Sequence, residues 1–152
     1  VVDGVGCSNG LGFTPDGAAM YHTDSRAHTI YLYDYDRATG EIANRREFIR
    51  APEDEEGSPD GMTVDAEGCV WAAFWDGSRL VRFRPDGSEE RRVASAARKV
   101  SSVIFAGEDY TDMYVTTAGG GNKAEEGEGA GALFRLRADV GGVPEFPSRI
   151  GL

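Results

Sequence analysis

A short frame of residues recurs along this chain, and such a repeat constrains the fold more than any single residue does. In its clearest copy, Asp60 stands between Pro59 and Gly61 and leads into alternating apolar and small residues. An earlier copy surrounds Asn9 and a later one surrounds Ser101. The separations of 51 residues (9 to 60) and 41 residues (60 to 101) bracket the length of a four-stranded β-propeller blade.

The segments between these copies have the pattern of β-strands. Short runs rich in β-branched and aromatic residues alternate in polarity and are separated by turn residues. Strands are expected at residues 19–24, 29–35, 41–49, 62–64, 69–75, 79–84, 89–93, 99–106, 112–117 and 132–136. No stretch has helical spacing, and the Gly/Glu-rich residues 119–131 are expected to form a flexible loop. We therefore predict one all-β domain, residues 1–152, with about three four-stranded blades arranged radially.

The composition narrows the classes of partner and compartment. The net charge is −10, from 26 acidic and 16 basic residues, which disfavours nucleic acid. No apolar run approaches the roughly 20 residues of a membrane-spanning helix, and no signal region opens the chain. Cys7 and Cys69 lack metal-type spacing and are expected to be free, mostly buried thiols. A soluble, cytoplasmic protein that binds neither membrane nor nucleic acid is the expectation.

The repeat also predicts a site. In a propeller the first strand of each blade lines the central channel, so equivalent positions of successive blades approach one axis. Asn9, Asp60 and either Ser101 or Ser102 occupy that position, and all of them carry oxygen, the donor that hard cations prefer. The alternative is that Asn9 and Asp60 only cap turns. Their shared repeat phase, with a glycine after each, favours a cation site.

Motifs that follow one another from about Gly6 to Leu136 resemble a known family. They include Asn9-Gly10-Leu11, Thr14-Pro15-Asp16-Gly17, Pro59-Asp60-Gly61-Met62, Asp65-Ala66-Glu67-Gly68 and Tyr114-Val115-Thr116. In this order they resemble the senescence marker protein/gluconolactonase family, which includes regucalcin. The resemblance implies a six-bladed β-propeller with one central divalent cation and activity on sugar lactones. It also implies that Asn9 and Asp60 are metal ligands, the same two residues that the repeat phase selects.

Part of the family pattern has no counterpart in this sequence. The third protein ligand of the cation, a Glu, and the Arg, Asn and Glu that contact substrate in the first half of the family are absent. The chain also begins at Val1, directly before a repeat. The resemblance therefore implies a partial propeller that corresponds to the C-terminal half. A missing N-terminal half or a second copy is expected to complete the ring.

The function that these features imply is divalent-metal-dependent hydrolysis of a sugar lactone. One cation, Ca²⁺, Zn²⁺, Mn²⁺ or Mg²⁺, would polarise the ester carbonyl and activate a water, and Asp60 would accept the proton as the catalytic residue. The chain by itself is expected to be inactive. Two alternatives stay open: a calcium-binding regulatory protein of the regucalcin type, and a non-catalytic propeller scaffold that binds partners through its loops.

Several other chemically capable residues are expected to be structural. His22 and His28 flank a hairpin without a third metal ligand, and Asp24 is a weaker candidate for the pocket. The aromatic residues Trp71, Phe74 and Trp75 are expected to pack in the core between blades. The acidic residues Glu125, Glu126 and Glu128 are expected to lie in a flexible loop, because they lack EF-hand spacing.

Overall fold

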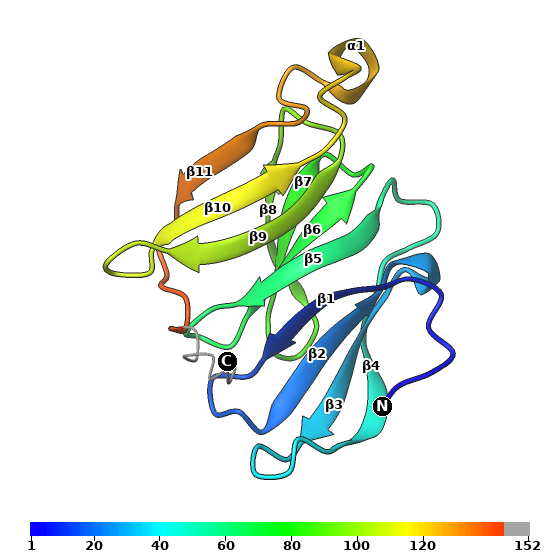
Figure 1. The fold of residues 1–152 in the computed structure, drawn as a ribbon, viewed down its shortest axis with the longest axis vertical. Helices are drawn as coiled ribbons and strands as arrows, with labels where there is room; N and C mark the ends of the chain where they lie inside the picture. Colours follow the sequence, from blue (N-terminus) through cyan, green and yellow to red (C-terminus); the bar gives the residue numbers. More distant parts are fainter. Residues whose placement is uncertain (145–152) are drawn as a thin grey trace, which may run out of the picture.

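The computed structural model describes residues 1–144 as three antiparallel sheets, each built from strands in sequence order (Figure 1). Sheet 1 contains β1 (Ser8–Phe13), β2 (Ala19–Asp24), β3 (Thr29–Tyr35) and β4 (Ile42–Arg50). Sheet 2 contains β5 (Ser58–Val64), β6 (Val70–Trp75), β7 (Arg79–Phe83) and β8 (Glu89–Ala94). Sheet 3 contains β9 (Val100–Ala106), β10 (Asp112–Thr117) and β11 (Leu133–Arg137).

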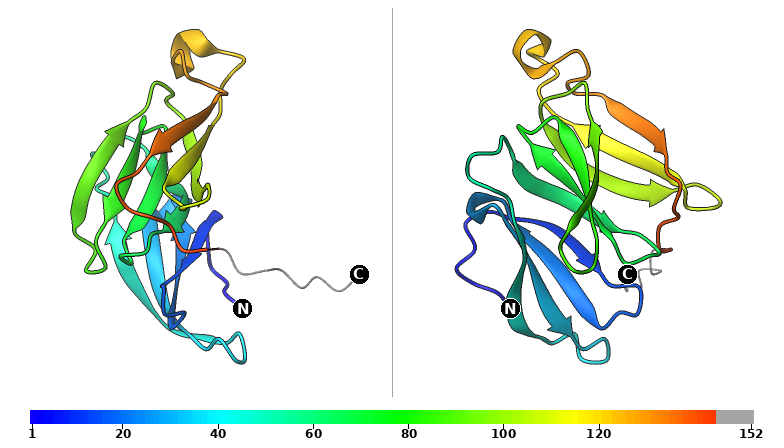
Figure 2. Two further views of the ribbon diagram at one scale, coloured as in Figure 1. Left: turned by 90° about the vertical axis from the view of Figure 1, so that its left-hand side faces the viewer. Right: turned by 180° about the vertical axis from the view of Figure 1, so that it is seen from behind.

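The sheets are arranged as propeller blades. Strands β1, β5 and β9 run side by side in the same direction (Figure 1), and the sheets follow one another in a row (Figure 2). The predicted all-β architecture is confirmed. Sheets 1 and 2 each have the four strands predicted for a blade, and sheet 3 has three strands within residues 1–144. After β11 the chain leaves the sheet, because Gly141 accepts a hydrogen bond from Ala66 N and Gly142 bridges Asp65 in sheet 2.

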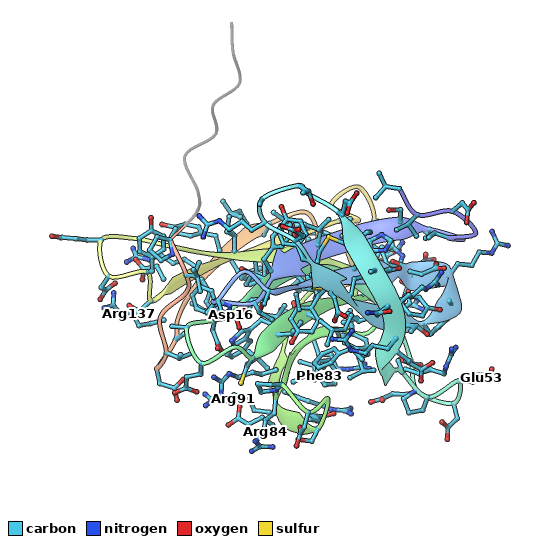
Figure 3. All side chains as sticks on the ribbon, turned by 90° about the horizontal axis from the view of Figure 1, so that it is seen from below. Asp16, Glu53, Phe83, Arg84, Arg91 and Arg137 are labelled. Carbon is cyan, nitrogen blue, oxygen red and sulfur yellow. The ribbon has the colours of Figure 1, made fainter. Side chains whose placement is uncertain are left out.

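Two hydrophobic clusters hold the sheets together, and β6 contributes to both. Alternate side chains of a strand point to opposite faces. Phe74 therefore packs between sheets 1 and 2, whereas Trp71 packs between sheets 2 and 3. Phe83 lies in the first cluster and the next residue, Arg84, points out into solvent (Figure 3). Trp75 was expected to be core, but it is only partly buried and belongs to neither cluster, with Lys99 Nζ 5.5 Å from its ring centroid.

A buried ionic network fixes the end of sheet 2 that lies away from the candidate site. Asp65 is fully buried and accepts hydrogen bonds from Arg82 Nε at 2.8 Å and Trp71 Nε1 at 2.9 Å. The backbone N–H groups of Glu67 and Cys69 also donate to its carboxylate, each at 3.0 Å. Burial of a carboxylate and a guanidinium is tolerated because each charge is paired and hydrogen-bonded. Asp65 therefore has a structural role.

The glycine-rich segment between β10 and β11 differs from the flexible loop that its composition predicts. It contains a short helix, α1 (Lys123–Glu126), and is attached to the residues before β9. Arg98 N donates to Glu126 O at 2.7 Å, Gly129 N donates to Ala96 O at 3.1 Å, and Lys99 pairs with the Glu126 carboxylate. A second short helix, η1 (Ser25–Ala27), joins β2 to β3. Neither of these two helices of residues 1–144 is long and apolar enough to cross a membrane.

The contact between the first strands of sheets 1 and 2 can be tested with Gly10→Ala. A β-carbon at Gly10 would lie 2.5 Å from Asp60 O and 2.8 Å from Met62 N, so the backbones would have to separate. We expect the free energy of unfolding to fall by about 1 to 3 kcal/mol, the usual cost of overpacking. Urea denaturation measures it. Gly121→Ala is the matched control, because nothing lies within 4 Å of its added β-carbon. Equal midpoints for the two variants would contradict the contact.

Candidate functional site

The candidate site lies where β1, β5 and β9 approach most closely. Gly10 in β1 lies against the backbone of residues 60–62 in β5. On the other side of β5, a β-carbon on Gly61 would lie 2.4 Å from Ser102 Oγ and 2.7 Å from Ser101 O in β9. Only glycine permits backbones to come this close. The glycines that follow Asn9 and Asp60 therefore bring three inner strands together.

Each inner strand also carries a register irregularity at this level. The pairing of β1 with β2 shifts between Ser8 and Leu11, and that of β5 with β6 shifts between Pro59 and Met62. The pairing of β9 with β10 shifts between Val100 and Ser102. Such bulges re-aim side chains and are frequent next to active sites. Asn9 and Asp60 thus lie inside strands, which disfavours the alternative that they only cap turns.

The structure brings together the two residues that the repeat phase selects. Asn9 donates a side-chain hydrogen bond to the Asp60 carboxylate, across the junction between sheets 1 and 2. Asp60 is 8% exposed. Burial raises the pKa of Asp60 above its ordinary value, and the hydrogen bond from Asn9 partly offsets that rise. Within residues 1–144 no cationic side chain forms an ion pair with Asp60.

This donor set is suited to a hard cation, but it is incomplete. A buried carboxylate without a cationic partner gains stability from a bound cation, and an amide oxygen is a further ligand that Ca²⁺ accepts. Asn9 can supply that oxygen while its N–H group bonds Asp60, because an amide is both donor and acceptor. Among residues 1–144, however, no group of three or more His, Cys, Asp or Glu side chains could hold a metal. A cation held by Asn9 and Asp60 would therefore need further oxygen ligands, from hydroxyl groups, backbone carbonyls, water or additional polypeptide.

A cleft lies along the inner strands next to the candidate site, and Asn9 and Asp60 are not among the residues that line it. Its volume is about 310 Å³. The inner strands line it, together with two residues near the end of the described chain: Leu11, Gly12, Phe13, Thr14 and Pro15; Met62, Thr63 and Val64; Ser102, Val103 and Ile104; and Val143 and Pro144. The lining is mostly apolar, with hydroxyl groups at intervals. A small molecule with both apolar and polar surface fits such a cleft.

Asp24, the weaker pocket candidate, is structural. Four backbone N–H groups donate to its carboxylate, those of Gly6, Cys7, Arg26 and Ala27, at 2.9 to 3.3 Å. Burial raises the pKa of Asp24, but these hydrogen bonds outweigh burial and hold the pKa below its ordinary value. The carboxylate caps η1 and attaches the segment before β1 to sheet 1.

The two histidines have different local settings in the structure. His22 is buried and its Nε2 lies 2.8 Å from Ser8 Oγ. Burial lowers the pKa of His22, so its ring is neutral at pH 7. His28 ends η1 in a left-handed conformation, with φ of 53°. Sequence reasoning missed the Ser8–His22 pair, because nothing in the order of residues predicts which serine meets a histidine across two strands.

The acidic loop likewise holds no cation site within the described residues. Glu126 pairs with Lys99, and Glu125 accepts a hydrogen bond from Asn122 Nδ2 at 2.7 Å. Both cysteines are free thiols. Cys69 is buried, as predicted, whereas Cys7 is exposed, because it precedes β1 at the surface. The exposed Cys7 thiol thus departs from the expectation of mostly buried thiols.

The chain is similar to a known protein family, to curated proteins and to solved structures. A family model described as SMP-30/Gluconolactonase/LRE-like region matches residues 1–119. A pentonolactonase from Haloferax volcanii is 45% identical over 100% of this chain and 54% of its own length. Regucalcin from Gallus gallus is 38% identical over 95% of this chain and 50% of its own length. A crystal structure of a calcium-binding protein, regucalcin, from Agrobacterium tumefaciens superposes with a TM-score of 0.82 at 26% identity, covering 91% of this chain and 48% of that one.

The chain thus spans about half the length of the curated relatives it matches. The expectation that it corresponds to their C-terminal half is not borne out by these comparisons. The comparisons support the coarser statement that the chain corresponds to about half of the length of such relatives.

The raised pKa of Asp60 predicts how stability depends on pH when no metal is bound. A carboxyl group with a raised folded-state pKa contributes stability that is full below its ordinary value of 3.8 and is lost as pH rises through the folded-state pKa. Asp60→Asn removes this loss, so the variant should gain stability relative to wild type as pH rises above 3.8. Urea denaturation in EDTA, repeated from acid to neutral pH, measures the difference.

Asp16→Asn is the control of opposite sign. Hydrogen bonds from Thr14 Oγ1 and Ala18 N hold the pKa of Asp16 below its ordinary value. That variant should therefore lose stability relative to wild type as pH rises. If the difference in the free energy of unfolding between Asp60→Asn and wild type stays constant with pH, burial does not perturb the pKa of Asp60.

Proposed function

The chain belongs to the SMP-30/gluconolactonase/LRE-like family, and on that premise we propose that it forms part of a lactonase that hydrolyses cyclic esters of sugar acids. The observation that carries the proposal is the contact between Asn9 and Asp60 at the junction of the inner strands. The relative from Haloferax volcanii is named a pentonolactonase, which agrees with this class of substrate. A small-molecule lactone also suits the size of the cleft beside the site.

Asn9 and Asp60 are the residues that would hold a divalent cation. When bound, a cation such as Ca²⁺, Zn²⁺, Mn²⁺ or Mg²⁺ would polarise the ester carbonyl and make a water more acidic. The Asp60 carboxylate would be the general base for that water. Asp60 would take a proton from the attacking water as the new C–O bond forms. It would return that proton to the ring oxygen as the ester bond breaks, which yields the open hydroxy acid.

Asn9 has a positioning role in this scheme. Its amide N–H group bonds the Asp60 carboxylate and so fixes which carboxylate oxygen is available for the proton. Its amide oxygen is left free to face the cation. Because the two residues come from different sheets, the relative position of sheets 1 and 2 determines the geometry of the site.

We propose further that additional polypeptide completes the ring, either another part of the same protein or a second copy, and that this chain alone is inactive. Leu11 lies between Gly10 and Gly12, which both face sheet 2, so it faces away from that sheet and is 51% exposed. Ile104 alternates with the buried Val103 and Phe105 and is 46% exposed. Exposed apolar side chains on both terminal sheets are suited to packing against further blades.

A calcium-binding regulatory protein is the second candidate. The similar structure from Agrobacterium tumefaciens is described as a calcium-binding protein, and an amide with a carboxylate provides the hard oxygen ligands that Ca²⁺ prefers. In that case the cation would be bound without turnover.

Substitution of Asp60 tests the catalytic assignment. In the full-length protein that contains this chain, Asp60→Ala should remove cation binding and lower the hydrolysis of glucono-δ-lactone by about 10²-fold or more, because it deletes both a ligand and the proton acceptor. Calorimetry measures the binding and a pH-stat measures the rate. The control Asp86→Asn lies in the turn between β7 and β8, at the opposite end of sheet 2, and should leave both unchanged. Retained lactonase activity in Asp60→Ala would end the proposal.

Addition of metal distinguishes the candidates. The full-length protein is treated with EDTA, and Zn²⁺, Mn²⁺, Mg²⁺ or Ca²⁺ is then added in the presence of glucono-δ-lactone. A restored rate is the outcome expected of a lactonase. Binding of Ca²⁺ without a restored rate would identify a regulatory protein, and the absence of both would leave a scaffold as the function.

A further inference from the structure

Three hydroxyl side chains lie together on sheet 3, and one of them, that of Ser102, borders the candidate site. Ser102 in β9 lies against Gly61, the residue after Asp60, and Ser102 also lines the cleft along the inner strands. Its neighbour Ser101 shares a hydrogen bond of 2.8 Å with Thr116 in β10. We call Ser101, Ser102 and Thr116 the hydroxyl group of sheet 3.

The Ser102 hydroxyl has no structural task in the described part of the chain. Packing at this point requires only a small side chain, because Ser102 Cβ would lie 2.6 Å from a β-carbon on Gly61. Alanine would satisfy that requirement equally well. Within residues 1–144 Ser102 Oγ has no hydrogen-bond partner, and the residue is half-buried at the edge of the cleft. A hydroxyl group that lies beside a cleft and has no hydrogen-bond partner in the described residues is available to a ligand.

The Ser101–Thr116 pair has hydrogen-bonding capacity left over. One hydroxyl of the pair donates to the other, so the second hydroxyl still has a proton to donate, and both oxygens have free lone pairs. The pair is exposed at the same end of sheet 3 as the register shift in β9. That shift places Ser101 at the level of the bulges around Asn9 and Asp60. The hydroxyl group therefore continues the site from sheets 1 and 2 onto sheet 3.

We propose that the hydroxyl group of sheet 3 binds the hydroxyl substituents of a polyhydroxylated lactone, while Asn9 and Asp60 act on its ester. This inference rests on the proposed function and specifies the substrate of the same site. Neutral hydroxyls donate and accept, so they match the hydroxyls of a polyol in either direction. They offer no charge to a carboxylate or a phosphate. Next to them, the cleft also has apolar lining, such as Phe13, which suits the C–H face of a sugar ring.

The proposal requires discrimination between lactones that differ only in their hydroxyl groups. A site that hydrogen-bonds substrate hydroxyls loses affinity for hydroxylated substrates when one of its partners is removed. Binding of a lactone that has no hydroxyls should not depend on those partners. Glucono-δ-lactone and δ-valerolactone form such a pair, because both are six-membered ring esters and only the first carries hydroxyls.

The experiment compares wild type, Ser102→Ala and Thr116→Val in the full-length protein that contains this chain. For each variant, kcat and KM are measured on both lactones. We expect Ser102→Ala to raise KM for glucono-δ-lactone about fivefold to tenfold with little change in kcat, the usual effect of one lost hydrogen bond. We expect Thr116→Val to have a similar but smaller effect. Neither variant should change kcat/KM for δ-valerolactone. Ser88→Ala, in the turn between β7 and β8, is the control and should change kcat and KM for neither lactone.

A second readout separates this inference from the proposed function. NMR titration with xylitol, a polyol without an ester, should shift the Ser102 amide resonance in wild type, and the shift should weaken in Ser102→Ala. Xylitol binding of this kind without lactone hydrolysis would support the inference and reject the lactonase. Hydrolysis in which Ser102→Ala changes both lactones equally, or neither, would overturn the inference and leave the lactonase standing. Absence of both hydrolysis and xylitol binding would overturn both.

Discussion

The structure depends on the close approach of its inner strands at two glycines. Gly10 lies against the backbone of β5, and Gly61 lies against Ser101 and Ser102 of β9. A side chain at either glycine would force the strands apart, because the nearest atoms would be less than 3 Å from its β-carbon. The same contacts that join the sheets therefore bring side chains from three separate blades to one place, and the site exists only as a consequence of this packing.

Burial of the Asp60 carboxylate costs free energy, which the rest of the fold has to offset. Asp60 is buried with one side-chain donor, Asn9, and burial raises its pKa. Asp65, at the other end of β5–β6, is buried with a guanidinium, an indole N–H and two backbone donors. The two carboxylates of one sheet show the difference between a group that the fold satisfies completely and a group that it leaves available. Carboxylates whose pKa values are perturbed by burial are enriched at functional sites.

The chain also has surfaces that its own sheets do not cover. Two hydrophobic clusters fill the spaces between neighbouring sheets, and β6 contributes side chains to both. Leu11 and Ile104 are exposed on the sheets at either end of the row. This distribution agrees with the finding that the chain spans about half the length of its relatives. In repeat architectures each unit contacts only its neighbours, so part of a ring can keep its internal packing while its end faces stay open.

The sequence by itself determined the repeat, the strand pattern apart from β1, and the selection of Asn9 and Asp60 as candidate site residues. Those features follow from the local alternation of apolar and polar residues and from the spacing of the repeats, both of which can be read directly from the order of residues. Only the tertiary structure decided that Asp60 lies at a bulge inside a strand, that Cys7 is exposed and that sheet 3 ends after three strands in the described residues. It also decided which hydroxyls surround the site, because Ser102 meets Gly61 across 41 residues of chain. Such contacts depend on how sheets pack, and packing is a property of side chains that are distant in sequence and adjacent only after folding.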